Sequence, residues 1–248
     1  MVHPRHISSR RTTLAGGAFS PDQLPSMVLW LDASDASSIT LSGSDVVGWS
    51  DKSGTGNDVA EVTTPPSLSV AAQNGLDGVY FDGTELISKS SPVSLDAWTN
   101  FSAFVVASNE DESNSAIMMG IYDTTGSDAT WCYRKNPSES VQFFLTFDGS
   151  TLNTLTSADD KGAEGGAFYA GFVYNDGVGR NLYTSGASAS GGTSGASHDS
   201  SADFIIGDST SADSPWTGHV YEVIIYNTSV SSGDRATIKA YLDKKWGL

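Results

Sequence analysis

The sequence predicts an all-β protein closed by one C-terminal α-helix. Short segments rich in β-branched and aromatic residues recur along the chain, separated by turn-forming pairs such as Asn74-Gly75 and Asp148-Gly149. Glycine accounts for 26 of the 248 residues, which indicates many turns. No helical pattern of useful length alternates with the strands, so a parallel α/β sheet is not expected. Strands at this spacing are typical of a sandwich or a barrel.

Strands are expected wherever apolar residues cluster between two turn signals. The expected strands are a buried-looking segment that begins at Met27, the segments Val46–Trp49, Val79–Asp82, Phe101–Ser108, Ala116–Tyr122, Thr130–Arg134, Val141–Phe147, Ala167–Asn175, Asn181–Thr184 and Asp203–Gly207, and the closing strand His219–Tyr226. Phe172–Tyr183 is the clearest hairpin, because apolar residues alternate on both sides of Asn175–Gly179. The low-complexity segment Ser185–Ser201 is expected to be a mobile surface loop.

One amphipathic helix is expected after the last strand. Its apolar stripe, at helical spacing, comprises Ile238, Tyr241, Leu242 and Trp246. Ser231 or Ser232 can cap the first turn, and Asp234 lies near the positive end of the helix dipole. Gly247 is expected to end the helix, because glycine readily adopts the left-handed conformation of a C-terminal cap.

The N-terminal segment differs in composition from the rest of the chain. Residues 1–25 are expected to form an extended arm, since prolines interrupt them and Gly16-Gly17 adds a flexible joint. The first 21 residues contain no Asp or Glu. The basic side chains expected to make this an assembly arm are Arg5, Arg10 and Arg11. Residues 26–248 are predicted to form a single domain, because strand patterns resume at once after each loop.

Composition excludes several classes of protein. The formal net charge of −16 argues against a nucleic-acid partner, because phosphate binding requires a basic face. Cys132 is the single cysteine, so no intrachain disulfide can form, and a small buried side chain is the expected role. No apolar run reaches the length of a membrane span, and the N-terminus lacks the apolar centre of a secretory signal. Membrane insertion is therefore not expected.

Three segments carry a family resemblance. They are LWLDASDASSIT (Leu29–Thr40), VVGWSDKSGTGNDV (Val46–Val59) leading to GLDGVYFDGTEL (Gly75–Leu86), and the closing block from IIGD to the last residue. In order and spacing the chain resembles the concanavalin A-like lectin/glucanase superfamily, and specifically its laminin-G-like branch, over nearly all of its length after the arm. The resemblance implies a two-sheet antiparallel jelly-roll sandwich. It does not decide function, because this fold hosts glycan binders, protein binders, hydrolases and structural modules.

The resemblance also implies candidate sites. Laminin-G-like relatives often hold a structural Ca²⁺, and the candidate oxygen donors here are Asp32, Asp35, Asp82 and Glu222. The alternative is that these carboxylates cap turns and face solvent; Tyr221-Glu222 stands where relatives often carry Asp-Glu. A glycan platform would need exposed aromatic rings, for which the candidates near loops are Trp131, Tyr133 and Trp216. Their alternative role is in the core, where tryptophan is usually found.

Catalytic signatures are missing from the sequence. Hydrolases of this superfamily carry paired carboxylates on one strand as E-x-D-x-x-E, so that acid and nucleophile face one sugar, and no such run exists here. Glu110-Asp111-Glu112 is consecutive and fits a solvated loop. The chain has no G-x-S-x-G motif, and its four histidines are too scattered to indicate a zinc site. We therefore expect no enzymatic activity and no cofactor other than the implied calcium.

Two functional hypotheses follow. The first is a non-enzymatic structural or decoration protein on the surface of a virus or phage particle, in the capsid or tail. Its basic arm would bind other virion proteins and its acidic body would face solvent. The alternative is a free or cell-surface carbohydrate-binding, lectin-like module. The two overlap, because a particle-surface lectin would use host-surface glycans for attachment.

Overall fold

The computed structural model describes residues 18–61, 64–111, 115–122, 128–138, 140–158, 166–193, 195–208 and 214–248. The predicted arm residues Arg5, Arg10 and Arg11 lie outside these ranges.

The strands are β1 (Met27–Asp32), β2 (Ile39–Ser42), β3 (Asp45–Trp49), β4 (Val59–Glu61), β5 (Ser67–Gln73), β6 (Leu76–Asp82), β7 (Ile87–Lys89), β8 (Asn100–Asn109), β9 (Ala116–Ile121), β10 (Trp131–Lys135), β11 (Val141–Leu145), β12 (Asn153–Thr156), β13 (Ala167–Asn175), β14 (Gly179–Thr184), β15 (Ser188–Gly191), β16 (Phe204–Ile206) and β17 (Thr217–Tyr226). The helices are the 3-10 turn η1 (Pro21–Gln23) and α1 (Ser232–Trp246).

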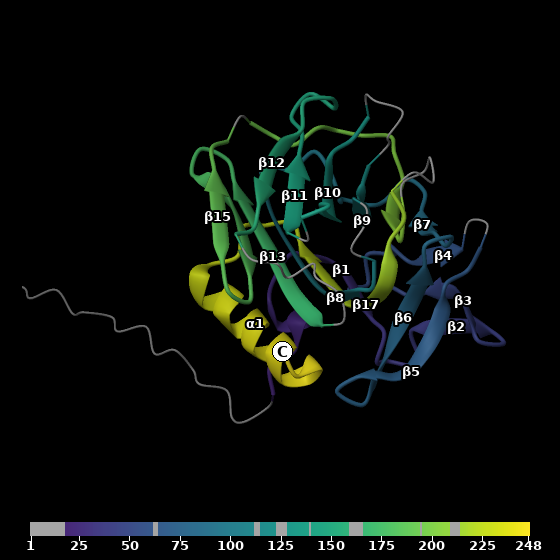
Figure 1. The fold of residues 1–248 in the computed structure, drawn as a ribbon. Helices are drawn as coiled ribbons and strands as arrows, with labels where there is room; N and C mark the ends of the chain where they lie inside the picture. Colours follow the sequence, from purple (N-terminus) through teal and green to yellow (C-terminus); the bar gives the residue numbers. More distant parts are fainter. Residues whose placement is uncertain are drawn as a thin grey trace, which may run out of the picture.

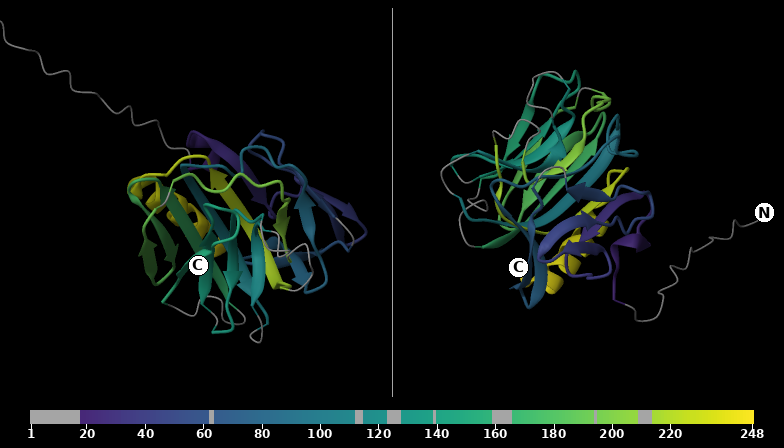
Figure 2. Two further views of the ribbon diagram at one scale, coloured as in Figure 1. Left: turned by 90° about the horizontal axis from the view of Figure 1, so that it is seen from above. Right: turned by 90° about the vertical axis from the view of Figure 1, so that its right-hand side faces the viewer.

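All strand pairs in these ranges are antiparallel and join into one continuous sheet, which curls until it is nearly a barrel (Figures 1 and 2). The predicted all-β class with one C-terminal helix is confirmed. The strand β17 is central: it pairs with β8 along one edge, and with β6 and then β1 along the other. From β8 the sheet continues through β13 and β14 to β15. The predicted hairpin is confirmed, with Phe172 opposite Leu182 and Asn175 opposite Gly179.

The sheet encloses one core and shares a second with the helix. The larger core lies inside the curled sheet and contains most of the buried aromatic residues, including Phe101, Phe143 and Phe172. The second core lies between the outer face of the sheet and α1, where Ile238, Leu242 and Trp246 are fully or almost fully buried. Figures 1 and 2 show α1 against the outside of the sheet. Residues of β8 and β17 are therefore buried on both faces of the sheet.

The helix begins and ends as its sequence predicts. The side chain of Ser231 accepts a hydrogen bond from the backbone nitrogen of Asp234, 3.1 Å away. At the other end Gly247 adopts φ 71°, in the left-handed region. Side chains from the turn between β5 and β6 then meet the last carbonyls: Gln73 donates to the carbonyl of Trp246, and Asn74 to that of Lys245. No helix among the described residues is long and apolar enough to cross a membrane.

One expectation about a loop is wrong. Within Ser185–Ser201, residues Ser188–Gly191 form β15 and pair with β14, with Arg180 opposite Gly191. Small polar side chains gave no strand signal, yet backbone hydrogen bonding in a ladder does not depend on them. The sequence also gives no clear signal for β2, β4, β5, β7 and β12, because these strands are short or polar.

Candidate functional site

A β-bulge in β17 places two consecutive side chains on the helix side of the sheet. Val220 pairs with Ala107 and Glu222 with Val106, so Tyr221 is the extra residue. In a regular strand Tyr221 and Glu222 would point to opposite faces. Here both contact Trp246 of α1: the ring of Tyr221 lies 5.2 Å from its ring, and Glu222 accepts a hydrogen bond from its indole nitrogen.

The carboxylate of Glu222 is buried and fully bonded. Its Oε1 accepts hydrogen bonds from Nε1 of Trp30 and the hydroxyl of Tyr241, each at 2.8 Å. Its Oε2 accepts from Nε1 of Trp246 at 2.7 Å and lies 2.9 Å from Nζ of Lys245. Burial raises the pKa of Glu222, and the charge of Lys245 opposes that effect. We call these five residues the Glu222 cluster; it joins α1 to β1 and β17.

The ammonium groups of two lysines pair with three of the predicted calcium ligands, Asp32, Asp35 and Glu222. Nζ of Lys245 lies 2.6 Å from Oδ1 of Asp32, in addition to its contact with Glu222. Nζ of Lys52 lies 3.0 Å from Oδ2 of Asp32 and 2.7 Å from Oδ2 of Asp35. Burial acts to raise the pKa of Asp32, but the charge and hydrogen bond of Lys245, together with hydrogen bonds from Ser34 and Lys52, outweigh it, so the pKa is lowered.

These residues do not fit a calcium ion. A Ca²⁺ site needs six to eight free oxygen ligands, whereas the oxygens of Asp32 and Glu222 are already held by lysine, serine, tyrosine and indole donors. The fourth predicted ligand, Asp82, lies apart from them and caps a turn by accepting from the backbone and hydroxyl of Thr84. Within the described ranges, no group of three or more His, Cys, Asp and Glu residues could hold a metal.

The loop after β3 fixes the position of Lys52. The carboxylate of Asp51 accepts from the backbone of Trp30 at 3.0 Å and of Ser53 at 2.8 Å. The buried amide of Asn57 donates to the carbonyl of Val28. These bonds tie the loop to β1, so that Nζ of Lys52 lies 4.1 Å above the ring of Trp30.

A row of aromatic rings leads from the Glu222 cluster to the surface. Beyond Trp246, the ring of Tyr221 stacks on that of His219 at 5.5 Å, and His219 lies 4.9 Å from Tyr80 on β6. Gly78 makes room for this row, because a Cβ atom there would lie 2.7 Å from the ring of Tyr221. Tyr80 and His219 are half-buried, so part of each ring remains in contact with solvent.

Polar groups from β8 border these rings. Oγ of Ser108 lies 3.4 Å from Nδ1 of His219 and 3.1 Å from the hydroxyl of Tyr221. Oε1 of the exposed Glu110 lies 3.4 Å from the same Nδ1. Burial lowers the pKa of His219, and Glu110 opposes this effect. Burial and the charge of Glu110 raise the pKa of Tyr80. We call Tyr80, Ser108, Glu110, His219 and Tyr221 the open face.

The open face does not have the geometry of a catalytic triad. In a triad the nucleophile bonds one imidazole nitrogen and the acid the other, so that the imidazole relays a proton. Here Ser108 and Glu110 both approach Nδ1 of His219. The arrangement instead offers the partly exposed rings of Tyr80 and His219 and one exposed carboxylate, which is chemistry suited to holding a hydroxylated ligand; Ser108 and Tyr221 support them from below the surface.

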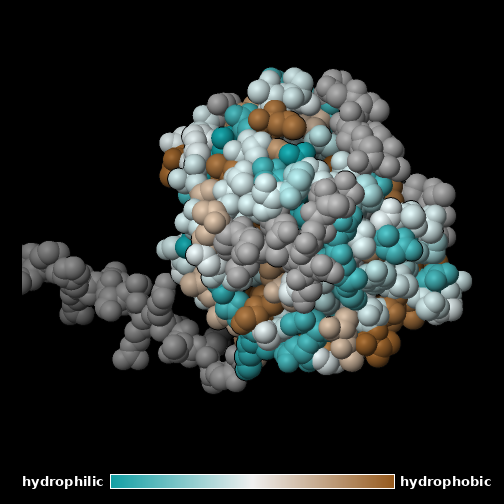
Figure 3. All heavy atoms as spheres, viewed as in Figure 1, coloured by the Kyte–Doolittle hydropathy of each residue, from teal (hydrophilic) through white to brown (hydrophobic). Residues whose placement is uncertain are grey.

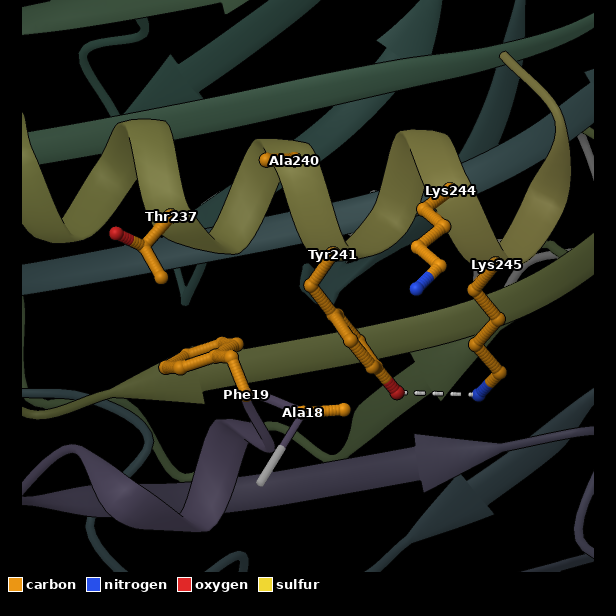
Figure 4. A pocket seen from close by; sticks show the side chains of 7 residues that line it. All are labelled: Ala18, Phe19, Thr237, Ala240, Tyr241, Lys244 and Lys245. Carbon is orange, nitrogen blue, oxygen red and sulfur yellow. Dashed lines mark hydrogen bonds between the residues drawn. The ribbon is translucent and has the colours of Figure 1, made fainter. Parts of the chain in front are cut away.

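On the other side of the Glu222 cluster lies a hollow of about 440 Å³ (Figure 4). Its walls come from the N-terminal segment and from the outer side of α1, and its lining is Ala18, Phe19, Thr237, Ala240, Tyr241, Lys244 and Lys245. The rings of Phe19 and Tyr241 meet edge to face at 5.9 Å. We call this the helix hollow.

The predicted glycan platforms are buried. Trp131, Tyr133 and Trp216 are each at most 1% exposed. Trp131 donates its indole hydrogen to the carbonyl of Leu95, and Tyr133 its hydroxyl hydrogen to that of Ala103. Their rings belong to the inner core and offer no face to a sugar, which corrects the expectation from the sequence.

Sequence reasoning missed Tyr80 and His219, and it assigned Glu110 to a solvated loop. The alternation in Gly78-Val79-Tyr80-Phe81 gave one signal, since it places Tyr80 on the face opposite to the buried Val79 and Phe81. Nothing local in the sequence indicated that β6, β8 and β17 would bring the three residues together.

Comparison with known proteins identifies the fold. No protein-family model matches the sequence, and no curated protein matches it. Several solved structures do match. One is the binding domain of Paraclostridial Mosquitocidal Protein 1, with a TM-score of 0.65 and 9% sequence identity; the match covers 88% of this chain and 52% of that one. The botulinum neurotoxin serotype D ligand binding domain in complex with N-acetylneuraminic acid also matches, with a TM-score of 0.62 and 13% identity over 88% of this chain and 50% of that one. The Trypanosoma rangeli sialidase in complex with the inhibitor DANA matches with a TM-score of 0.59 and 12% identity over 86% of this chain and 32% of that one.

At these identities the likeness establishes the fold alone. The chain spans about half the length of the two toxin domains and a third of the sialidase. None of these three neighbours is described as a virion protein. The laminin-G-like resemblance stays a prediction, because no comparison names that family.

Proposed function

We propose that this chain is a non-enzymatic glycan-binding module that holds a sugar against the open face. The observation that carries the proposal is the pair of partly exposed rings, Tyr80 and His219, beside the exposed carboxylate of Glu110. Aromatic faces stack on the apolar C–H surface of a sugar, and a carboxylate accepts hydrogen bonds from its hydroxyl groups. The underlying jelly-roll sandwich is part of the same proposal.

The fold comparison supports a binding role. Two of the neighbours named above are binding domains by description, one of them in complex with a sialic acid. The approach of Ser108 and Glu110 to one nitrogen of His219 supports binding over hydrolysis. A shallow face buries little of its ligand, so we expect weak binding, with a dissociation constant on the order of 1 mM for a single sugar.

The comparisons back this function better than virion decoration, for which none of the three neighbours offers support. One structural feature bears on a role for the arm. Its residues Phe19 and Pro21 are fixed to the domain, because Phe19 packs on Tyr241 and Tyr226 donates a hydrogen bond to the carbonyl of Pro21. Location on a virion surface and partners reached through the arm remain predictions. Removal of residues 1–17 followed by a particle-incorporation assay tests them.

A glycan array with the full chain tests the proposed function. Tyr80→Ala and Glu110→Gln are each expected to weaken binding of the best glycan about tenfold or more, because each removes one of the two kinds of contact. Tyr183→Ala is the matched control: Tyr183 is also half-buried on the helix side of the sheet, but it lies on β14 beneath Arg235. Binding that both variants leave unchanged would contradict the proposal, as would release of free sugar from the bound glycan.

A further inference from the structure

The helix hollow has a rigid apolar wall. Tyr241 lines it, and the hydroxyl of Tyr241 is fixed by Glu222 at 2.8 Å and Lys245 at 3.2 Å. Phe19 packs against the same ring, and apolar atoms contribute most of the lining surface. A volume of about 440 Å³ falls within the range of small-molecule sites, roughly 300–1,000 Å³. The hollow is therefore preformed and large enough for a small organic molecule.

Positive charge concentrates on the helix that forms this hollow. Although the chain carries −16 overall, α1 contains four of its 13 basic residues: Arg235, Lys239, Lys244 and Lys245. Three of these are engaged, because Lys239 pairs with Asp243, Lys245 with Asp32 and Glu222, and Arg235 lies 3.8 Å above the ring of Tyr183.

Lys244 differs from the other three. It is exposed, and no ion pair to it exists in the part of the chain that the structure describes. Figure 4 shows Lys244 and Lys245 at one end of the hollow, with Phe19 and Thr237 toward the other. An apolar wall with a free ammonium group at one end is complementary to a molecule that has an apolar body and one anionic group.

We propose that the helix hollow binds a small amphiphilic anion. Its apolar body lies against Phe19, Ala240 and Tyr241, and its carboxylate or sulfonate group pairs with Lys244. This site shares no residue with the open face, so it stands independently of the glycan proposal. Because the rest of the protein repels anions, the charge of Lys244 strengthens binding, and added salt weakens that contribution.

The probe for this site is anilinonaphthalene sulfonate, whose fluorescence rises in apolar surroundings, titrated into the full chain. We expect saturable binding that Lys244→Gln weakens about fivefold, as the loss of one partly exposed ion pair implies. Lys239→Gln removes the same charge from the same helix without lining the hollow, and it should leave the affinity unchanged. Ala240→Trp fills the hollow and should abolish binding. Neutral phenylnaphthylamine should bind the wild-type protein more weakly than the sulfonate does.

Each outcome decides the proposal. Equal affinities of the wild type, Lys244→Gln and Ala240→Trp would overturn it, because the dye would then bind elsewhere. Binding that appears only after removal of residues 1–17 would also overturn it, since the arm would be the occupant. A dimer seen by light scattering and dissociated by Ala240→Trp would overturn the proposal too, since a second copy of the chain would then fill the hollow. A cooperative unfolding transition should be recorded for each variant, to show that a loss of dye binding does not come from misfolding. Ala240→Leu, which fills the hollow with a smaller side chain, serves as a second test.

Discussion

The ammonium group of Lys245, on the last turn of α1, lies 2.9 Å from the buried carboxylate of Glu222 on β17. The same nitrogen lies 2.6 Å from Asp32 on β1. One lysine therefore compensates two carboxylates that have little contact with water, on two neighbouring strands. Because the indole groups of Trp30 and Trp246 occupy other lone pairs of Glu222, the helix is held to the sheet by a fully bonded charge cluster as well as by apolar packing.

Removal of the ammonium group should strongly destabilise the fold. Lys245→Met leaves the buried carboxylate of Glu222 without a counter-charge, whereas Asp32 keeps its pair with Lys52. Breaking a buried pair in this way costs about 3–5 kcal/mol. Lys239→Met is the control, because Lys239 forms a partly exposed i,i+4 pair with Asp243 on the same helix, worth about 0.3–0.5 kcal/mol. Urea denaturation at neutral pH measures both free energies of unfolding. Equal effects of the two variants would mean that the Glu222 cluster contributes little to stability.

Two buried tryptophans should differ in their response to loss of the indole nitrogen. Trp246→Phe removes a hydrogen bond to a buried charge, worth about 1.5–3 kcal/mol, together with part of the ring. Trp216→Phe removes the same ring volume, but Nε1 of Trp216 has no hydrogen-bond partner among the described residues. Both side chains are fully buried, so the difference in unfolding free energy between the two variants isolates the hydrogen bond. A larger loss for Trp216→Phe would contradict this assignment.

Lys52 should set the titration of Asp35. The hydrogen bond from Lys52 is the largest cause, ahead of hydrogen bonds from Ser37, that lowers the pKa of Asp35 from 3.8 to about 2. In Lys52→Met, the pKa measured from the carboxyl carbon shift by NMR should return toward 3.8. Because a carboxyl whose pKa is lowered on folding stabilises the folded state only when ionised, the stability difference between wild type and variant should be complete above pH 4 and disappear as the pH falls toward 2. An unchanged pKa in the variant would show that Lys52 does not govern it.

The helix was predictable because its signals are local. Ser231, the apolar stripe and Gly247 lie within one continuous segment, and the structure uses all of them as the spacing indicates. The hairpin around Asn175–Gly179 was predictable for the same reason.

The sites were not predictable, because they depend on pairing between distant segments. Glu222 and Trp30 are 192 residues apart, and the bulge at Tyr221 follows from the register of β17 against β8. Burial was hard to assign because the sheet is covered on both faces, so alternation along β8 does not separate core from surface. Trp131, Tyr133 and Trp216 are candidates for exposed rings from the sequence because they lie near loops, yet they are buried, whereas Tyr80 is partly exposed.

Cys132 should report on global unfolding. The sequence predicts a small buried side chain, and the structure confirms it with 0% exposure and a pKa that burial raises to about 12. Because the thiolate is the reacting form, Ellman's reagent should not label the folded chain at mildly alkaline pH and should detect one thiol per chain after denaturation. Labelling then requires opening of the core, so its rate in Lys245→Met should rise about 100- to 4,000-fold if that variant loses about 3–5 kcal/mol. Rapid labelling of the native wild type, insensitive to low urea, would show instead that β10 opens locally around Cys132.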